Sequence, residues 1–198
     1  DFSDGNWKVI HEPKTGLLHA RLAGLQSSQF DWVLFCDDDN VLSPDFLQKA
    51  EQLLGSEQKL GVLGSLGIPE FLGPKPDWFD RYASSFAVGP QALNPYGSPR
   101  LVHVYGACSI YRKEPFLALI SSGFKPALTD RSKSSLSSGG DVEWCWLMQL
   151  LGYRISYSGS LQFTHRLPAS RLRWTYYLNL KRGISSSPGL LTSYTYFF

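Results

Sequence analysis

Apolar and polar residues alternate along the first part of the chain in blocks that predict regular secondary structure. Apolar side chains spaced three and four residues apart predict a helix over 17–26, and the continuous apolar run 32–36 predicts a buried strand. The short run 7–10 is expected to form a strand ahead of them. The order strand, helix, strand favours a parallel sheet and hence an α/β fold.

The middle of the chain continues this pattern. Ser43-Pro44 predicts the start of a helix, because serine caps helices well and proline fits the first helical position. Strands are predicted over 60–68 and 101–111, and a helix over 113–121. The stretch 69–100 is rich in proline, glycine and aromatic residues and is expected to be largely irregular.

The last third of the chain begins with a segment rich in serine and lysine. A long mobile loop is predicted over 121–140, followed by a helix over 141–151 that ends at the next glycine. Two short strands, 153–157 and 161–164, precede a basic and aromatic helix over 170–182. The whole pattern predicts a mixed α/β sheet with helices on both sides.

Composition narrows the class of protein. The chain has 198 residues, of which 43% are hydrophobic and 18% charged, and this suits one globular domain. The net charge of +2 gives no reason to expect binding to nucleic acid. No apolar stretch reaches the length of a membrane span, and no signal peptide is visible. Three scattered cysteines, Cys36, Cys108 and Cys145, favour reduced thiols and a cytoplasmic location over a disulfide framework or a zinc site.

Three consecutive aspartates, Asp37, Asp38 and Asp39, directly follow the predicted strand 32–36. Carboxylates at the carboxyl edge of an α/β sheet lie where such folds bind ligands, and their oxygens suit Mg²⁺ or Mn²⁺. Asp39 is the best candidate for a metal ligand and Asp37 for a contact to sugar hydroxyls, with Asp38 between them. The alternative is a solvated turn that caps the following helix.

A second acidic pair, Asp141 and Glu143, follows two glycines at the predicted start of a helix. The helix dipole favours ionised carboxylates there. Because residues two apart point to different sides of a helix, one acid can face a cleft while the other braces the loop. The alternative is that Asp141 is simply a helix cap.

Small and basic residues supply further candidates. Gly106 and Ala107 weaken the predicted strand around them, which either a sugar lying against the sheet or tight helix packing would explain. His165 follows a predicted strand, with a structural role as its alternative. Arg171 and Arg173 would suit a diphosphate near a divalent ion, because guanidinium groups bind phosphate in a bidentate way. A solvated helix face is the alternative for these arginines.

The residues that carry a family resemblance are, in chain order, 12–21, 35–40, 43–47, 106–107, 140–143 and 173–174. Together they resemble the inverting GT-A glycosyltransferases of family 2, which use nucleotide sugars, and the similarity spans roughly 5–183. Within it, 35–40 is similar to the family's Asp-x-Asp metal motif. The resemblance implies a Rossmann-like GT-A fold with a mixed, mostly parallel sheet flanked by helices.

The resemblance also implies one glycosyltransferase domain, 1–198, with three parts. Residues 1–68 would bind the donor and the metal, 69–165 would form the acceptor and catalytic part, and 166–198 would be a basic, aromatic helix and tail. The family's first strand has no counterpart, so the chain is interpreted as an N-terminally truncated fragment. Ser170 stands where the processive synthases have Gln, so processive synthesis is not supported.

Residue roles follow from the same resemblance. Asp39 and His165 would hold Mg²⁺ or Mn²⁺. Asp141 would be the general base, with Glu143 the second choice. The expected donor-binding residues are Asp37, Asp38, Arg21, Gly106, Ala107, Arg173 and Trp174.

The resemblance implies a nucleotide-sugar donor and a glycan or lipid-linked acceptor, as in the assembly of polysaccharides. It places the protein in the cytoplasm, with the inner membrane surface as an alternative location. The basic and aromatic residues of 170–182 fit contact with an anionic membrane surface, and they fit a packed terminal helix equally well.

Two other classes of function stay open. Asp37-x-Asp39-x-Val41 fits a phosphatase of the haloacid dehalogenase type with Asp37 as nucleophile, although a convincing later lysine and paired acids are lacking. A non-catalytic, sugar-binding fragment is the other alternative, and the missing first strand favours it.

Overall fold

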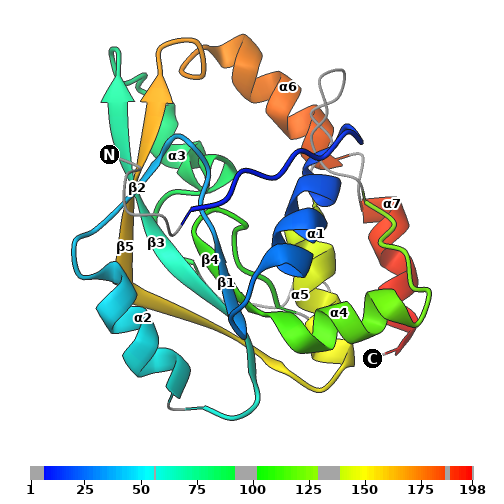
Figure 1. Cartoon of the computed structure of the whole chain (residues 1–198). Helices are drawn as coiled ribbons and strands as arrows, with labels where there is room; N and C mark the ends of the chain where they lie inside the picture. Colours follow the sequence, from blue (N-terminus) through cyan, green and yellow to red (C-terminus); the bar gives the residue numbers. More distant parts are fainter. Residues whose placement is uncertain (1–6, 56, 92–101, 129–138, 186–187, 198) are drawn as a thin grey trace.

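The computed structural model describes residues 7–55, 57–91, 102–128, 139–185 and 188–197. Within them one five-stranded sheet lies at the centre and helices cover both of its faces (Figure 1). Its strands are β1 (Trp32–Phe35), β2 (Asn40–Leu42), β3 (Leu60–Leu72), β4 (Ser109–Arg112) and β5 (Arg154–Pro168). Their order across the sheet is β1-β4-β3-β5-β2.

The sheet is mixed. β3 and β5 run parallel to each other along most of their length, from the pair Leu60 and Arg154 to the pair Leu72 and Pro168. The pairings of β1 with β4, of β4 with β3 and of β5 with β2 are antiparallel. The two long strands therefore form a spine, and three short strands are added to it.

Five helices pack around this sheet or above its end: α1 (Leu17–Ser27), α2 (Phe46–Gly55), α4 (Lys113–Ser121), α5 (Gly140–Leu150) and α6 (Trp174–Ser185). Shorter helical segments in the described residues are α3 (Phe79–Tyr82), η1 (Ala83–Phe86), α7 (Pro188–Leu191) and η2 (Thr192–Phe197). None of the described helices is long and apolar enough to cross a membrane.

Consecutive residues of a strand point to opposite faces, and this alternation divides the interior into two cores. Val62 and Tyr111 face the side covered by α1, α4 and α5, where the fully buried Trp144 packs against Tyr111. Leu63 and Ile110 face the other side, which α2 covers. Figure 1 shows the three helices together on one side of the sheet and α2 on the other.

A third apolar cluster lies beyond these two cores, where α6 packs on α3 and η1. It is largely aromatic: Tyr82 stacks on Tyr177 at 4.6 Å between ring centroids, and Trp78 meets Trp174 edge to face at 5.3 Å. These contacts fix α6 above one end of the sheet, and its start is therefore held close to the residues that precede it, 165–171.

The predicted helices are confirmed in kind and approximate position, as is an α/β fold with a mixed sheet flanked by helices. α1 occupies the expected range 17–26, α4 matches 113–121, and α5 ends before Gly152, whose φ of +83° suits glycine. The helix predicted after Ser43-Pro44 begins at Phe46, and the helix predicted at 170–182 begins at Trp174.

Other predictions are wrong. Residues 7–10 form no strand, so the order strand, helix, strand expected at the start of the chain is not found there. The run 32–36 does form a strand, but β1 is only half-buried and pairs antiparallel with β4. The sheet is mixed, as expected: its longest ladder, between β3 and β5, is parallel, and the three short ladders are antiparallel. An apolar run indicates burial, but it does not specify the direction of the neighbouring strand.

Strand lengths also differ from the predictions. Only Ser109–Arg112 of the predicted strand 101–111 is a strand, and Gly106 and Ala107 lie in the bend and turn before it. The two short strands predicted after residue 152 are one strand, β5, with a register shift where the break was expected. β3 continues to Leu72, and the supposedly irregular region after it contains α3 and η1. Residues 92–101 and 129–138 lie outside the described residues.

Candidate active site

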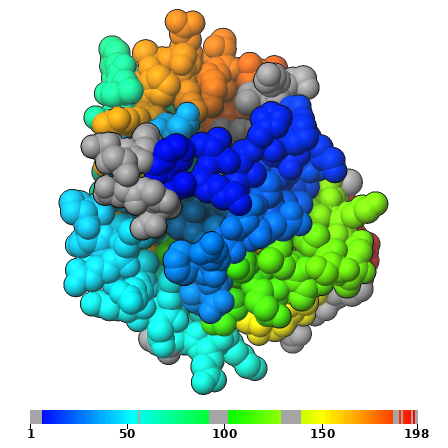
Figure 2. Space-filling model, in the orientation of Figure 1, coloured from blue at the N-terminus to red at the C-terminus, as the bar shows by residue number. Residues whose placement is uncertain are grey.

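A cavity of about 1240 Å³ opens beside the carboxyl end of β1. Its walls come from the start of α1, the acid loop (residues 37–39), the segment 84–91, the segment 103–107, the start of α5 and the inner face of α6. Figure 2 shows the segment before α1 lying across this face of the molecule, and Glu12 and Lys14 from that segment also line the cavity.

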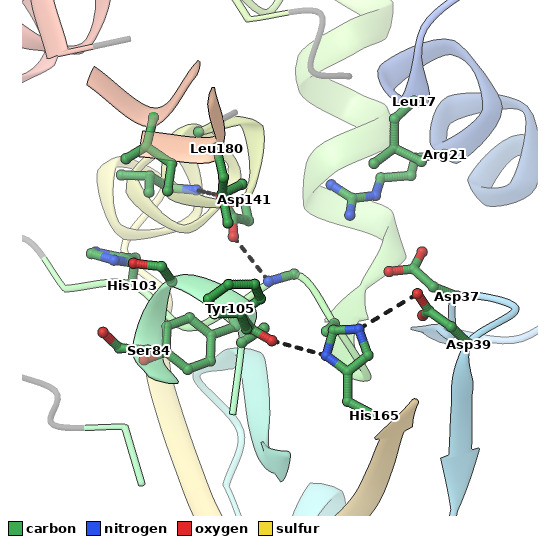
Figure 3. A pocket seen from close by; sticks show the side chains of 18 of the residues that line it. Leu17, Arg21, Asp37, Asp39, Ser84, His103, Tyr105, Asp141, His165 and Leu180 are labelled. Carbon is green, nitrogen blue, oxygen red and sulfur yellow. Dashed lines mark hydrogen bonds and ion pairs between the residues drawn. The ribbon is translucent and has the colours of Figure 1, made fainter. Parts of the chain in front are cut away.

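Pairing of β2 with β5 brings two distant predicted residues together. Asn40 lies opposite His165 in the register, and the backbone N–H of Arg166 donates to the carbonyl of Asp39 at 2.9 Å. As a result His165 Nε2 lies 3.5 Å from Asp39 Oδ2, a separation shown by a dashed line in Figure 3. The predicted metal ligands are therefore neighbours in space, although 126 positions separate them in the chain.

The backbone fixes the orientation of the His165 ring. Nδ1 lies 2.8 Å from the carbonyl oxygen of Phe86, so this nitrogen carries the proton and donates it. Nε2 then keeps its lone pair on the side that faces Asp39. Burial lowers the pKa of His165, with Asp39 acting in the opposite direction and Arg171 in the same one, and the ring is accordingly neutral near pH 7. A neutral imidazole with its other nitrogen fixed is the form that binds metals.

A cationic side chain occupies the same corner. Arg171 Nη1 lies 2.6 Å from Asp39 Oδ2, and the two side chains are only 29% and 19% exposed. The same Nη1 is 3.4 Å from His165 Nε2. Arg171 therefore neutralises the carboxylate that was expected to bind a metal.

The donor atoms at this corner fit a small divalent cation with few protein ligands. Asp39 offers carboxylate oxygens and His165 an imidazole nitrogen, whereas no group of three or more His, Cys, Asp or Glu residues that could hold a metal is found in the described part of the chain. Mg²⁺ commonly binds through one or two protein side chains, with water and substrate phosphates as its other ligands. Asp37 and Asp38, also on the cavity wall, are exposed.

Asp141 lies at the start of α5 and is held by two backbone donors. The N–H of Val142 donates to its Oδ1 at 2.9 Å and the N–H of Gly106 donates to its Oδ2 at 3.0 Å. Gly139 holds the cap position of α5, so Asp141 lies within the first turn of the helix and its carboxylate also reaches the wall at Gly106. Each carboxylate oxygen still has a second lone pair, so Asp141 can accept a proton from a ligand in the cavity.

Gly106 allows the approach of two side chains. A Cβ atom at this position would lie 2.9 Å from Nη2 of Arg21 and 3.1 Å from Cβ of Asp141. Arg21 is buried, and its guanidinium lies 5.6 Å from the centre of the Phe35 ring. In Figure 3 Arg21 points into the cavity between Asp141 and the acid loop. The small residue at 106 is thus required by close contact within the site, and Ala107 beside it also lines the cavity.

Glu143 is fully buried and does not line the cavity. Its two carboxylate oxygens accept the backbone N–H groups of Ala127, at 2.7 Å, and Leu128, at 2.9 Å. The hydroxyl of Tyr194 also donates to Glu143. Glu143 therefore braces the loop before α5 and the C-terminal segment, while Asp141 faces the cavity. This division was one of the arrangements expected from the sequence, and it favours Asp141 over Glu143 as a base.

The arginine and tryptophan expected at the donor site lie elsewhere. Among the described residues that line the cavity, Arg173 and Trp174 do not occur. Arg173 is exposed, and Trp174 packs on the aromatic cluster beneath α6. Arg171 is the arginine of this stretch that reaches the cavity. The sequence pattern marked the stretch as basic but could not say which arginine faces inward, because the helix begins only at Trp174.

Sequence reasoning missed Gln91, which holds one wall of the cavity. Its Nε2 donates to the carbonyl of Ser65 on β3 at 2.8 Å, and its Oε1 accepts the N–H of Tyr105 at 2.6 Å. In the same way, the side-chain amide of Gln149 accepts the backbone N–H of Val102 and donates to the carbonyl of Val102. A single glutamine in an irregular region gives no pattern by which this role could have been recognised.

His103 is the second lining residue that the sequence did not single out. It belongs to the same wall and lines the cavity, and Figure 3 shows it to one side of Asp141. Burial lowers the pKa of His103, and the nearby Asp141 acts against this shift. The wall around Asp141 thus contains a mostly neutral imidazole at pH 7.

Comparison with known proteins identifies the class. The sequence profile of glycosyl transferase family 2 matches residues 1–119, which is 119 of the 198 residues. The chain belongs to glycosyl transferase family 2, and it is a glycosyltransferase whose partners are a nucleotide-sugar donor and an acceptor. No curated protein matches the chain. The family match includes Arg21 and the acid loop but ends before Asp141 and His165.

Proposed function

We propose that this glycosyltransferase moves a sugar from a nucleoside diphosphate sugar to an acceptor hydroxyl with inversion, and that it requires Mg²⁺ or Mn²⁺. The observation that carries the proposal is one cavity that contains two kinds of group. Asp39, His165 and Arg171 gather at one corner, and Asp141 lies on the wall formed by α5. A diphosphate and an acceptor hydroxyl need such a pair of environments.

Asp39 and His165 would hold the divalent ion at the first of these environments. When bound, the ion supplies positive charge that stabilises the leaving diphosphate. With a divalent ion on Asp39, Arg171 would be available to the phosphate oxygens, for which its guanidinium is well suited. The guanidinium group that pairs with Asp39 in the structure would then bind the donor diphosphate.

The remaining donor contacts come from the acid loop and from α1. Asp37 and Asp38 are exposed on the cavity wall and can accept hydrogen bonds from sugar hydroxyls. Arg21 projects between them and Asp141, and its positive charge favours the donor phosphates. Gly106 gives its space to Arg21 and Asp141, and Ala107 beside it adds only a methyl group to the wall that would face the sugar ring.

Asp141 acts as the general base. It takes the proton of the acceptor hydroxyl while the oxygen attacks the anomeric carbon opposite the diphosphate, and this in-line attack inverts the configuration. The two backbone N–H groups that bind its carboxylate hold it in one orientation.

The acceptor is proposed to be a glycan or a lipid-linked glycan, in a pathway of polysaccharide assembly on the cytoplasmic face of a membrane. The outer side of α6 supports contact with a membrane surface: Trp174 is 43% and Leu178 38% exposed, and Arg173 and Arg182 are exposed beside them. We keep the division of the domain into a donor part, 1–68, an acceptor part, 69–165, and a C-terminal part, 166–198, as part of this proposal.

The family assignment weighs against the two alternatives drawn from the sequence. A phosphatase with Asp37 as nucleophile leaves the pairing of Asp39 with His165 and the placement of Asp141 without a purpose. A non-catalytic sugar-binding module would not need a carboxylate oriented by two backbone donors.

The proposal is tested with a panel of nucleoside diphosphate sugars and Mn²⁺. Binding is followed by thermal shift, and donor hydrolysis or transfer is followed by release of nucleoside diphosphate. Asp141→Asn should lower turnover roughly 10²- to 10⁴-fold, the usual contribution of a general base, and leave donor binding unchanged. Asp31→Asn, an exposed aspartate away from the cavity, is the matched control. Near-normal turnover by Asp141→Asn contradicts the assignment of the base, and absence of any Mn²⁺-dependent binding contradicts the donor site.

A further inference from the structure

Two cysteines meet beside the cavity, each next in the chain to a residue that lines it, Asp37 and Ala107. The Sγ atoms of Cys36 and Cys108 are 3.9 Å apart, although 72 positions separate the residues in the chain. Both are free thiols; Cys36 is exposed to solvent and Cys108 is buried beneath it. Nothing in the proposed transfer reaction uses either sulfur, so their proximity requires a separate explanation.

The register of the sheet accounts for the meeting. β1 and β4 pair antiparallel, and their last ladder pair is Phe35 with Ser109. One step further along this register, Cys36 and Cys108 come to face each other. Directly opposed residues of antiparallel strands have Cα atoms about 4.5–5.5 Å apart, and disulfides span Cα separations of about 4.4–6.8 Å. The ladder itself ends at Phe35 and Ser109, and Cys108 lies in the turn before β4, so the 3.9 Å between the sulfurs is the direct evidence that the two cysteines are in reach of each other.

The surroundings of the pair connect it to the site. Cys36 immediately precedes the acid loop, whose first residue is Asp37. Cys108 ends the turn that begins at Gly106, the residue whose N–H binds Asp141. The carbonyl of Cys108 accepts a hydrogen bond from the hydroxyl of Ser65 at 2.7 Å, so β3 holds Cys108 in place. A bond between the sulfurs would link the acid loop to the wall that carries Asp141.

We propose that Cys36 and Cys108 form a reversible disulfide that fixes the acid loop to the turn before β4, with a small-molecule disulfide such as oxidised glutathione as the oxidant. Cys36, the exposed partner, loses its proton and attacks one sulfur of glutathione disulfide, which releases one glutathione thiolate. Cys108 then loses its proton and attacks the sulfur of Cys36 in this mixed disulfide, and the second glutathione leaves. The two protein thiols are oxidised by two electrons, one glutathione disulfide is reduced to two thiols, and the two protons pass to the leaving thiolates.

The two thiols differ in exposure and in pKa, and both differences favour Cys36 as the first to attack. Burial raises the pKa of Cys36, and burial raises the pKa of Cys108 much further. Cys36 is thus the better thiolate as well as the accessible one, and it is the first to react. The sulfurs must approach from 3.9 Å to the bond length of about 2.05 Å, a movement that the exposed loop after Cys36 can supply.

Mass spectrometry of the intact protein, after equilibration with reduced and oxidised glutathione, tests the bond. The wild type should lose the mass of two hydrogens in the oxidised buffer, and a non-reducing peptide map should join Cys36 to Cys108. Cys36→Ser, an exposed substitution, should abolish the change, whereas Cys145→Ala should keep it because Cys145 is buried in the core of α5. A wild type that keeps three thiols, or one that joins Cys145 or a second molecule, overturns the proposal.

Hydrogen exchange of the same samples tests the effect on the loop, and it needs no donor. Amides of residues 37–42 should exchange more slowly in the oxidised wild type than in the reduced one, and Cys36→Ser should show no difference between the buffers. Equal exchange in a protein with the mapped bond overturns the claim that the bond fixes the loop. These readouts are separate from nucleotide binding, so the proposed transferase function can fail while this inference stands, and the reverse also holds.

Discussion

Replacement of Arg171 should have opposite effects on the binding of the two ligands of the proposed donor site, the metal ion and the nucleoside diphosphate. Arg171→Met is therefore the most informative substitution. In the structure Arg171 Nη1 lies 2.6 Å from Asp39 Oδ2, the oxygen that would bind a divalent ion. Removing it frees that oxygen. Removing it also deletes the cation that is proposed to bind the diphosphate. Mn²⁺ alone should therefore bind more tightly to the variant, and the nucleoside diphosphate more weakly.

The magnitudes follow from the burial of the pair. With side chains 29% and 19% exposed, the ion pair lies between fully exposed and fully buried examples. We take its strength as about 1 kcal/mol after allowance for solvent, which corresponds to roughly fivefold tighter binding of Mn²⁺. A lost hydrogen bond from a charged donor costs about 1.5–3 kcal/mol, which corresponds to roughly 10- to 150-fold weaker binding of the diphosphate.

Isothermal titration calorimetry at pH 8 measures both constants, first with Mn²⁺ alone and then with the tightest-binding nucleoside diphosphate at saturating Mn²⁺. Arg173→Met is the matched control, because Arg173 is exposed two positions away and does not line the cavity. It should change neither constant. Weaker Mn²⁺ binding by Arg171→Met would refute the reasoning, and so would a loss of diphosphate binding in Arg173→Met but not in Arg171→Met.

Three further predictions concern the walls of the site. Gly106→Ala places a methyl group against Asp141, so turnover should fall by more than any loss of thermal stability explains, as measured by initial rates and melting temperature side by side. Glu143→Gln leaves one buried backbone N–H facing an amide NH₂ and should cost about 1–3 kcal/mol in urea unfolding, whereas Tyr194→Phe should cost about 1 kcal/mol; equal costs would contradict the bracing role. Burial lowers the pKa of His165 below its usual 6.5, and the ring binds metal only when neutral. Mn²⁺ affinity should consequently stay level from pH 8 down to about 6.5 and fall only below it, and a decline that begins above pH 7 would contradict this placement.

Much of the helical framework could be predicted from the sequence, because helix periodicity and caps are local. α1 and α4 appear where apolar spacing placed them, and α5 begins beside its glycines. Strand pairing could not be predicted in the same way. Trp32 pairs with Arg112, 80 positions away, and no feature of either run specifies this partner or its direction. A long-range contact of this kind depends on the whole chain.

The candidate site shows the same division. The acid loop and Asp141 were recognisable because several acidic residues adjoin a predicted strand or helix start. The association of Asp39 with His165 depends on the register of β2 and β5, which only the structure gives. The choice of Arg171 over Arg173 depends on where α6 begins, and the role of Gln91 depends on two backbone groups from separate parts of the chain.

Hydrogen bonds from side chains hold in place the wall of the cavity next to Asp141. Gln91, Gln149 and Asp141 hold the segment Val102–Gly106 through their amide and carboxylate groups, in place of the ladder of an adjacent strand. Exchange of Gln91 or Gln149 can therefore reshape the surface proposed to meet the acceptor, without replacing Asp141 and without a change in the strand pairing of β4. A lineage built on this scaffold can acquire new acceptors through a few substitutions while its sheet, and the donor corner attached to it, remain as they are.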